Sequence, residues 1–453
     1  MKKNRISLLV LLLIGSVLVG TAGPVAARKV TLEVWGLDPE DQGYGALIDY
    51  WNKNNPDIQV NAIAAGMRIQ DPQKLLTAIA AGTGPDVAWV DRFQIASWVA
   101  RNAFQPLDDL AAANDFVAED VFYEPALDEA TYLGSLWALP TTTDSRALYL
   151  NIDLLDDAGL SADDLDTGNW EQLTEYAVKL TRRDSSGRVT QIGFVPTQDP
   201  WTLGSGGMWL WGWANGGREV DEEGNVALDN PQFVEALEWA VDVIDKCGGM
   251  VEVADFASGF GPGAQEGFIQ GKIAIRLNHN EFLRDIARYR PDLNFTVLPI
   301  KYRNSNNLLS FGGGHSLVIP RGTDKLKEAW AFMEWFTSAE AWVLHAQAWK
   351  AYFESEGRPW IPTFSANKLA NELVLRQVFQ PQEEKWLHFV RIFEELLNYN
   401  RFRAQSPVGH QIHQAFLFEA QQEAQYHVKT AEQALRDATV KCQQELEEFL
   451  RHQ

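Results

Sequence analysis

The sequence has little cysteine and few long apolar runs, and each scarcity excludes a class of protein. Only Cys247 and Cys442 occur among its 453 residues, too few for a disulfide scaffold and wrongly spaced for zinc. A bridge between them stays open, although Cys442 lies on an apolar stripe at helical spacing, where a small core residue is expected. Beyond the amino terminus there is no run of 18 apolar residues and no G-x-x-x-x-G-K-[ST] loop. The chain is therefore neither a membrane permease nor a P-loop ATPase.

Positive charge and catalytic motifs are also scarce. Lys and Arg number 39 against 61 Asp and Glu, which leaves a net charge of −22. Such a surface repels nucleic acid and anionic lipid, so we expect no nucleic-acid partner. No G-x-S-x-G, H-E-x-x-H or clustered Cys/His motif occurs. The chain offers no standard hydrolase or metal centre, and we expect no metal and no cofactor.

The amino terminus is typical of an export signal. Lys2, Lys3 and Arg5 precede an apolar run over residues 6–19, and small residues follow as far as Ala27. The run is shorter than the ~20 residues of a membrane-spanning helix, so a cleavable signal at residues 1–27 is favoured over an anchor. A lipoprotein signal requires a Cys at the cleavage point, and no Cys lies there. We expect a soluble protein in the periplasm or extracytoplasmic space.

The chain alternates between strand and helix patterns. Residues 30–35, 57–60 and 86–90 read as strands, with apolar-periodic helices between them, which predicts an α/β fold with a mostly parallel sheet flanked by helices in each lobe. The length exceeds the ~250–300 residues of a single core, so two lobes are expected. Crossings are predicted at residues 137–144 and 301–307. One lobe then holds residues 28–141 and 308–355; the other holds 142–307 and 356–453, with long carboxy-terminal helices.

Several short motifs occur in a characteristic order. They are T-L-E-V-W-G at 31–36, A-A-G-T-G-P-D-V at 80–87, A-L-P at 138–140, G-K-I-A-I at 271–275 and G-G-G-H-S-L-V-I at 312–319. In this order they resemble the family 1 extracellular sugar-binding proteins of bacterial ABC importers. The resemblance implies the two-lobed type II periplasmic binding fold with three crossing segments, and a receptor that performs no chemistry. It also implies a carbohydrate ligand and a permease partner; we expect a monomer.

The resemblance also implies ligand-binding residues. Asp91 and Arg92 match an acid and a base that hydrogen-bond sugar hydroxyls in maltose-binding members, and Asp144 matches a ligand-binding acid. Asp199 and Trp201, in Q-D-P-W, match an acid and a stacking ring. Asp38 falls in the loop after the first strand, where such members also place an acid.

The chain departs from these members at one informative place. Asn278, His279 and Glu281 stand where N-G-P-W supplies a stacking tryptophan, which puts maltose itself in doubt. Gly313 and His315 lie in a glycine loop that suits close approach of the backbone to a ligand or hinge. We expect His315 or Trp360 to replace the lost aromatic surface.

The chemistry of a sugar requires both kinds of residue. Its hydroxyls need planar polar partners and its CH faces need aromatic rings, and the chain contains 17 Trp. Two alternatives remain open: a polyamine or other small-solute receptor of the same fold, and a secreted glycoside-active enzyme using Asp91 and Asp144.

Overall fold

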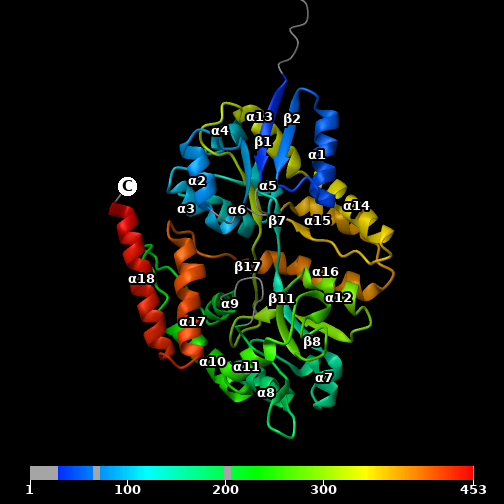
Figure 1. The fold of residues 1–453 in the computed structure, drawn as a ribbon, viewed down its shortest axis with the longest axis vertical. Coiled ribbons are helices and arrows are strands. Elements are labelled where there is room, and N and C mark those ends of the chain that lie inside the picture. Colours follow the sequence, from blue (N-terminus) through cyan, green and yellow to red (C-terminus); the bar gives the residue numbers. More distant parts are fainter. Residues whose placement is uncertain (1–28, 65–71, 198–205, 452–453) are drawn as a thin grey trace, which may run out of the picture.

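The computed structural model describes residues 29–64, 72–197 and 206–451, and two lobes lie one above the other and meet at a waist (Figure 1). The upper lobe is built on a five-stranded sheet. Its strands follow the order β2 (Ile58–Ile63), β1 (Val30–Trp35), β3 (Val87–Asp91), β15 (His315–Val318) and β6 (Leu139–Pro140). The pairs of β1 with β2 and β3 are parallel, as predicted, whereas β15 runs antiparallel to β3. The α/β, two-lobed architecture predicted from the sequence is confirmed.

Helices cover the upper sheet, and short polar side chains start several of them. Asp41 accepts the free backbone N–H groups at the start of α1 (Gln42–Asn54), and Ser338 does the same for α14 (Ala339–Ser355). Asn367 caps α15 (Lys368–Gln377). Helices α14 and α15 pack together through a buried apolar cluster, which also holds α15 in this lobe.

The lower lobe contains a three-stranded sheet in the order β11 (Ile275–His279), β8 (Arg146–Asn151), β12 (Phe295–Leu298). Both outer strands pair antiparallel to β8, so the expected parallel pairing was wrong here. The reason is that β8 comes down from the waist while its neighbours run upward toward it. Around the sheet lie α8 (Trp170–Leu180), α9 (Gly206–Ala214), α10 (Pro231–Cys247) and α12 (Phe282–Tyr289).

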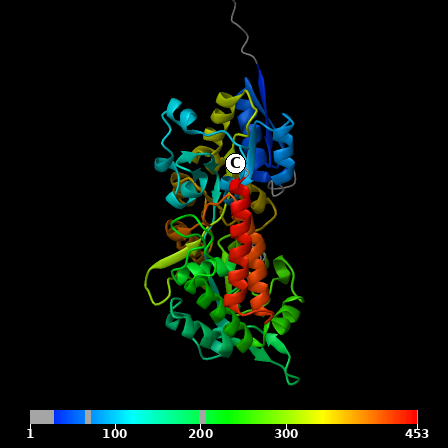
Figure 2. The ribbon, with the colours of Figure 1, turned by 90° about the vertical axis from the view of Figure 1, so that its left-hand side faces the viewer.

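The carboxy-terminal helices belong mostly to the lower lobe. Helix α16 (Glu384–Leu396) contacts β8 and β12, while α17 (Leu417–Gln425) and α18 (Ala431–Arg451) stand side by side along one flank (Figure 2). Cys442 lies on the buried face of α18, as predicted, and Cys247 is buried at the end of α10. Both are free, so the open alternative of a bridge is not realised.

Where the chain crosses the waist differs in part from the sequence-based boundaries. Residues 302–307 form the turn between the antiparallel strands β13 (Ile300–Lys301) and β14 (Leu308–Phe311), so the predicted crossing there was wrong. The chain instead returns through the glycines between β14 and β15. Helix α15 packs on the upper lobe rather than the lower, and the third crossing follows it, before α16.

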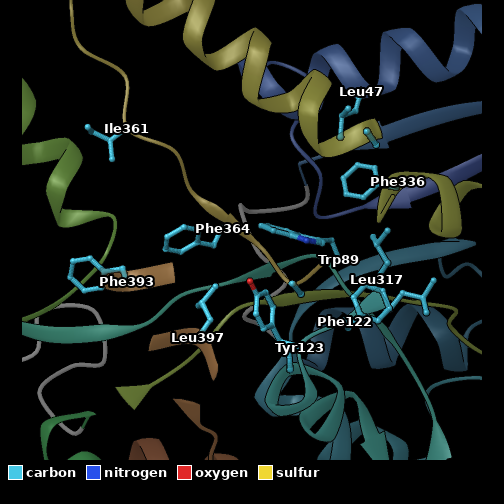
Figure 3. Packing of buried hydrophobic residues seen from close by; sticks show 14 of the residues in the cluster. Leu47, Trp89, Phe122, Tyr123, Leu317, Phe336, Ile361, Phe364, Phe393 and Leu397 are labelled. Atoms are coloured by element: carbon cyan, nitrogen blue, oxygen red, sulfur yellow. The ribbon is translucent and has the colours of Figure 1, made fainter. Parts of the chain in front are cut away.

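An apolar cluster runs through the waist and joins the lobes. It contains Leu317 of the upper sheet and Phe295 of the lower sheet. Figure 3 shows Trp89 near its middle, with Phe364 on the side toward Phe393. Because these side chains are buried and belong to both lobes, the cluster packs the lobes against each other at the waist.

Candidate functional site: the cleft between the lobes

A cavity of about 520 Å³ lies between the lobes. Strand ends form its edges: Asp91, the last residue of β3, pairs with His315, the first of β15, and Arg146, the first of β8, pairs with His279, the last of β11. Sites in open α/β sheets form at such strand ends. We call the part next to the waist the inner end, which is lined by Trp89, Asp91, Asp144, Arg146, Trp209, His279, Phe311, Gly313, His315 and Arg403.

Asp144 is held in the inner end as an ionised carboxylate. Its Oδ1 accepts a hydrogen bond from Arg146 Nη1 at 2.9 Å and another from the backbone N–H of Gly313 at 2.8 Å. Burial works to raise the pKa of Asp144, but Arg146, His279, the Gly313 N–H and Arg92 outweigh it, and the pKa lies below its ordinary value. The acid is therefore a permanent hydrogen-bond acceptor, as its predicted role requires.

Asp91 also lines the inner end, and its neighbour there comes from far along the chain. Arg403 Nη2 lies 3.9 Å from Asp91 Oδ1 and 3.6 Å from Glu129 Oε1. The guanidinium carbon of Arg403 lies 4.1 Å from the ring centroid of Phe93. Arg403 follows the short strand β17 (Asn400–Arg401). Sequence reasoning missed it, because no motif marks it and only the fold brings it to β3.

Arg92 does not line the cleft, and its predicted contact with the ligand is wrong for this structure. Its side chain is fully buried. Its Nε donates to Glu129 at 3.2 Å, and its Nη atoms donate to the carbonyls of Thr142, Gly313 and His315. Burial raises the pKa of Glu129 to about 7, although Arg403 and Arg92 lie beside it. Arg92 thus ties two crossing segments to the upper lobe instead of reaching a ligand.

The glycine loop fits its predicted role of close backbone approach. Gly314 has φ +142°, and a Cβ there would lie 2.1 Å from the carbonyl oxygen of Thr142, so a larger residue would force two crossing segments apart. Gly313 lines the cavity and donates its N–H to Asp144.

His315 and Trp89 form a stacked pair at the inner end. Their ring centroids lie 4.0 Å apart with 20° between the planes, and Trp89 Nε1 donates to Thr141 Oγ1 at 2.9 Å. His315 was predicted to supply surface to the site, and it does line the cavity. Trp89 was missed, because it lies in the apolar run of β3, where a tryptophan is expected to be core.

The end of β11 brings His279 and Glu281 into the cavity. Glu281 donates its backbone N–H to His279 Nδ1 at 3.1 Å, and its carboxylate accepts from Arg284 at 2.6 Å. Asn278, predicted with them, points the other way: it is buried, and its Oδ1 accepts the backbone N–H of His279. Alternation along the strand separates the neighbours.

The outer end of the cleft has a different lining. The upper lobe supplies Tyr44 from α1 and His345, Trp349 and Phe353 from α14, and the lower lobe supplies Arg284, Asp285 and Arg288 from α12. His345 is buried, and burial, with Arg284 facing it, lowers its pKa to about 3. Sequence reasoning missed this end. Its one available signal was the recurrence of aromatic residues every four positions along residues 345–353.

The remaining predicted residues divide three ways. Asp38 lines the cavity, and its Oδ1 accepts the backbone N–H of Glu40 at 2.9 Å. Trp360 does not line it; the ring packs edge-on against Phe379, with centroids 5.9 Å apart, so the expected replacement surface is not supplied by Trp360. Asp199 and Trp201 lie outside the described residues, as does the predicted signal at 1–27.

Two searches of the described ranges bear on other kinds of site. In residues 29–64, 72–197 and 206–451, no three His, Cys, Asp or Glu side chains are grouped so as to hold a metal ion. Within the same ranges, no helix combines the length and the apolar character needed to cross a bilayer.

Residues 36–341 match the bacterial extracellular solute-binding proteins. The match covers more than half of the chain, and the chain belongs to this family, whose members act outside the cytoplasm.

Curated relatives and solved structures agree with this assignment. An arabinooligosaccharide-binding protein of Bacillus subtilis is 27% identical over 75% of this chain and 77% of its own length. One from Halalkalibacterium halodurans is 26% identical over 64% of this chain. That alignment spans 63% of the relative, slightly under two thirds of its length.

Among solved structures, CpMnBP1 with mannobiose bound has a TM-score of 0.71 and 25% identity, covering 92% of this chain and 100% of that one. The sugar-binding protein MalE of Xanthomonas citri also has a TM-score of 0.71, at 16% identity, over 92% of this chain and 98% of its own. The latter likeness establishes the fold alone.

Proposed function

We propose that this chain is the substrate-binding component of an ABC importer, which captures a neutral sugar or polyol between its lobes. The observation that carries the proposal is the composition of the cleft. Aromatic rings lie beside carboxyl and guanidinium groups, and both lobes contribute. A sugar presents apolar CH faces and a rim of hydroxyls, so it needs this combination in one cavity.

The charges within the cleft support a neutral ligand over a polyamine. Three of its carboxylates lie within ion-pair distance of an arginine: Asp144 with Arg146 at 2.9 Å, Glu281 with Arg284 at 2.6 Å and Asp91 with Arg403 at 3.9 Å. A cation site needs carboxylates left to neutralise the ligand. For these three carboxylates, arginines of the protein already supply the positive charge, and their remaining hydrogen-bonding capacity suits hydroxyls; Asp38, Asp41 and Asp285 also line the cavity.

The same pairing argues against the glycoside-active alternative. A glycosidase needs one carboxylic acid whose pKa is raised, so that it can protonate the leaving oxygen. Of the two acids that this alternative uses, Asp144 has its pKa shifted the opposite way by Arg146 and His279. Burial raises the pKa of two other acids that line the cavity, Asp41 and Asp285. The relatives support the receptor interpretation too, since those named above bind arabino-oligosaccharides or hold mannobiose.

Transport follows from the two-lobed design. Ligand contacts to both lobes favour the closed form over the open one, because only the closed form makes both sets. The three crossings at the waist act as the hinge, and a membrane permease then recognises the closed lobes. We propose that the protein does this as a monomer outside the cytoplasm, after removal of residues 1–27.

A carbohydrate screen tests the proposal. Residues 28–453 are incubated with arabinose, mannose, xylose and glucose, their oligosaccharides of two to four units, and mannitol, and melting temperature is recorded. We expect at least one saccharide or polyol to raise it, chromatography to recover that ligand unchanged, and small-angle scattering to show a smaller radius of gyration. A cleaved product at multiple turnovers contradicts the receptor role. No stabilisation by any ligand of the panel contradicts the proposed ligand class.

A further inference from the structure

Helix α14 places a row of rings along the cleft wall. His345, Trp349 and Phe353 recur every four residues, and all three line the cavity. Residues at this spacing share one face of a helix. The row advances about 12 Å along the helix axis, at 1.5 Å per residue. A single sugar ring, similar in width to one aromatic ring, covers only part of such a row.

The row continues inward to the waist through α1. Tyr44 lies 5.0 Å from the His345 ring and 5.4 Å from the Trp89 ring, measured between centroids. Backbone proximity fixes this contact: a Cβ on Gly43 would lie 2.2 Å from His345 and 2.7 Å from Trp349. The aromatic wall therefore extends without interruption from Trp89 at the inner end to Phe353 at the outer end.

The opposite wall is polar along the same length. Helix α12 of the lower lobe presents Arg284 and Arg288 to the cavity. Arg284 is fixed by its ion pair with Glu281, and Arg288 is exposed, with its guanidinium carbon 4.8 Å from the Tyr289 ring centroid. A guanidinium offers several donors in one plane and matches neighbouring hydroxyls of a sugar.

We propose that the outer end is a subsite for the second and later units of an oligosaccharide, and that Trp349 and Phe353 select chains over single sugars. The inference rests on the proposed function and adds to it the chain length of the ligand. One sugar occupies the inner end, with Asp144 and Trp89. The following units lie between the rings of α14 and the arginines of α12, where a monosaccharide makes no contact.

Calorimetric titration of a length series tests the proposal. The wild-type protein is titrated with one-, two- and three-unit members of the arabinose, mannose, xylose and glucose series. We expect three units to bind at least ~10-fold more tightly than one, since a stacked ring contributes on the scale of an interface hot spot. Trp349→Ala and Phe353→Ala should each weaken three-unit binding ~10-fold or more and leave one-unit binding within ~2-fold.

Trp335→Ala is the matched control. Trp335 is a partly buried tryptophan of the neighbouring helix α13 (Leu326–Phe336), stacked on Tyr50 and outside the cavity. It should leave the length preference intact, and melting curves identify any variant that does not fold.

The possible failures are distinguishable. Equal affinity of the wild type for one and three units overturns the subsite while leaving the sugar receptor standing. Equal weakening of both lengths by Phe353→Ala does the same. If the wild type binds no member of any series, this proposal fails; if mannitol does not bind either, the proposed ligand class fails with it.

Discussion

The two ends of the cleft are built from different interactions. At the inner end the charged groups are paired, as Asp144 with Arg146 shows, and behind it the buried Arg92 pairs with Glu129. At the outer end the wall is aromatic, and Arg288 stands exposed at the rim. The inner end is also where the crossing segments meet, whereas the outer end lies between helices α14 and α12.

This difference separates two tasks. Paired charges in a buried setting hold a geometry in place, and their loss disturbs folding before binding. Partly exposed rings at the outer end contribute less to folding and are available for contact with a ligand. Substitutions at the waist should therefore have the largest effects on the free energy of unfolding, whereas substitutions of the outer rings should mainly affect ligand binding.

Arg92→Ala should have the largest effect. It removes one of the two arginines beside the buried Glu129, together with the hydrogen bonds that Arg92 donates to the carbonyls of Thr142, Gly313 and His315, so the free energy of unfolding should fall by about 3–5 kcal/mol. Denaturant titration measures it. Arg188→Ala, at an exposed ion pair with Asp184, is the control and should cost under ~1 kcal/mol. A stable Arg92→Ala protein with lost affinity would restore the ligand role that the resemblance implied.

Asp144→Asn sharpens the comparison within the inner end. It removes an ionised acceptor while keeping the shape of the side chain, and hydrogen bonds to charged groups contribute about 1.5–3 kcal/mol. Affinity for the sugar found in the screen should fall ~10- to 100-fold by calorimetry. Asp242→Asn, on α10 and paired with Lys246 at the surface, should leave affinity unchanged. If Asp144→Asn binds the sugar with unchanged affinity, Asp144 does not contact the ligand.

His345, at the outer end, makes the stability of the fold depend on pH. The folded pKa of about 3 lies below the ordinary value of 6.5, so below pH 6.5 the unfolded chain takes up a proton that the folded chain does not. Stability is therefore lost as pH falls from 6.5 toward 3. Between pH 7 and pH 5 the loss due to His345 is about 2 kcal/mol.

His345→Gln tests this contribution against the wild type. Denaturant titrations at pH 7 and pH 5 should show a smaller loss for the variant by about that amount. His413, also buried and with its pKa lowered by burial, acts equally in both proteins. If the free energy of unfolding falls equally in both proteins between pH 7 and pH 5, the fold does not lower the pKa of His345.

How far the sequence predicted the site depends on what each prediction used. Asp91 and Asp144 follow a strand or a crossing, and strand ends converge in an α/β sheet, so position along the chain was sufficient. Arg92 is adjacent to Asp91, yet β3 ends at Asp91 and Arg92 begins the short helix η1 (Arg92–Gln94), from which its side chain reaches the buried Glu129 instead of the cleft.

The missed residues share a different property. Arg403, Tyr44 and Trp349 reach the cleft only because remote segments pack together, and no local pattern records that packing. Trp89 was missed for a related reason. The local pattern around a tryptophan in a buried strand is the same whether the ring lies in the core or forms the wall of a binding site. The two-lobed fold was predictable because strand and helix periodicity is local, whereas the direction of β11 and β12 against β8 depended on the crossing.

Trp360→Ala should have the smallest effect on affinity and sets the limit of the cleft. The resemblance left this residue as a candidate to replace a lost stacking ring, but its ring packs on Phe379 and lies outside the cavity lining. Truncation removes apolar contact near α14 and α15, so the melting temperature should drop. Affinity should stay within about twofold, because no contact to the ligand is lost. Calorimetry alongside melting curves separates the two effects. A tenfold loss of affinity with an unchanged melting temperature would extend the site past Phe353 and make Trp360 part of its outer end.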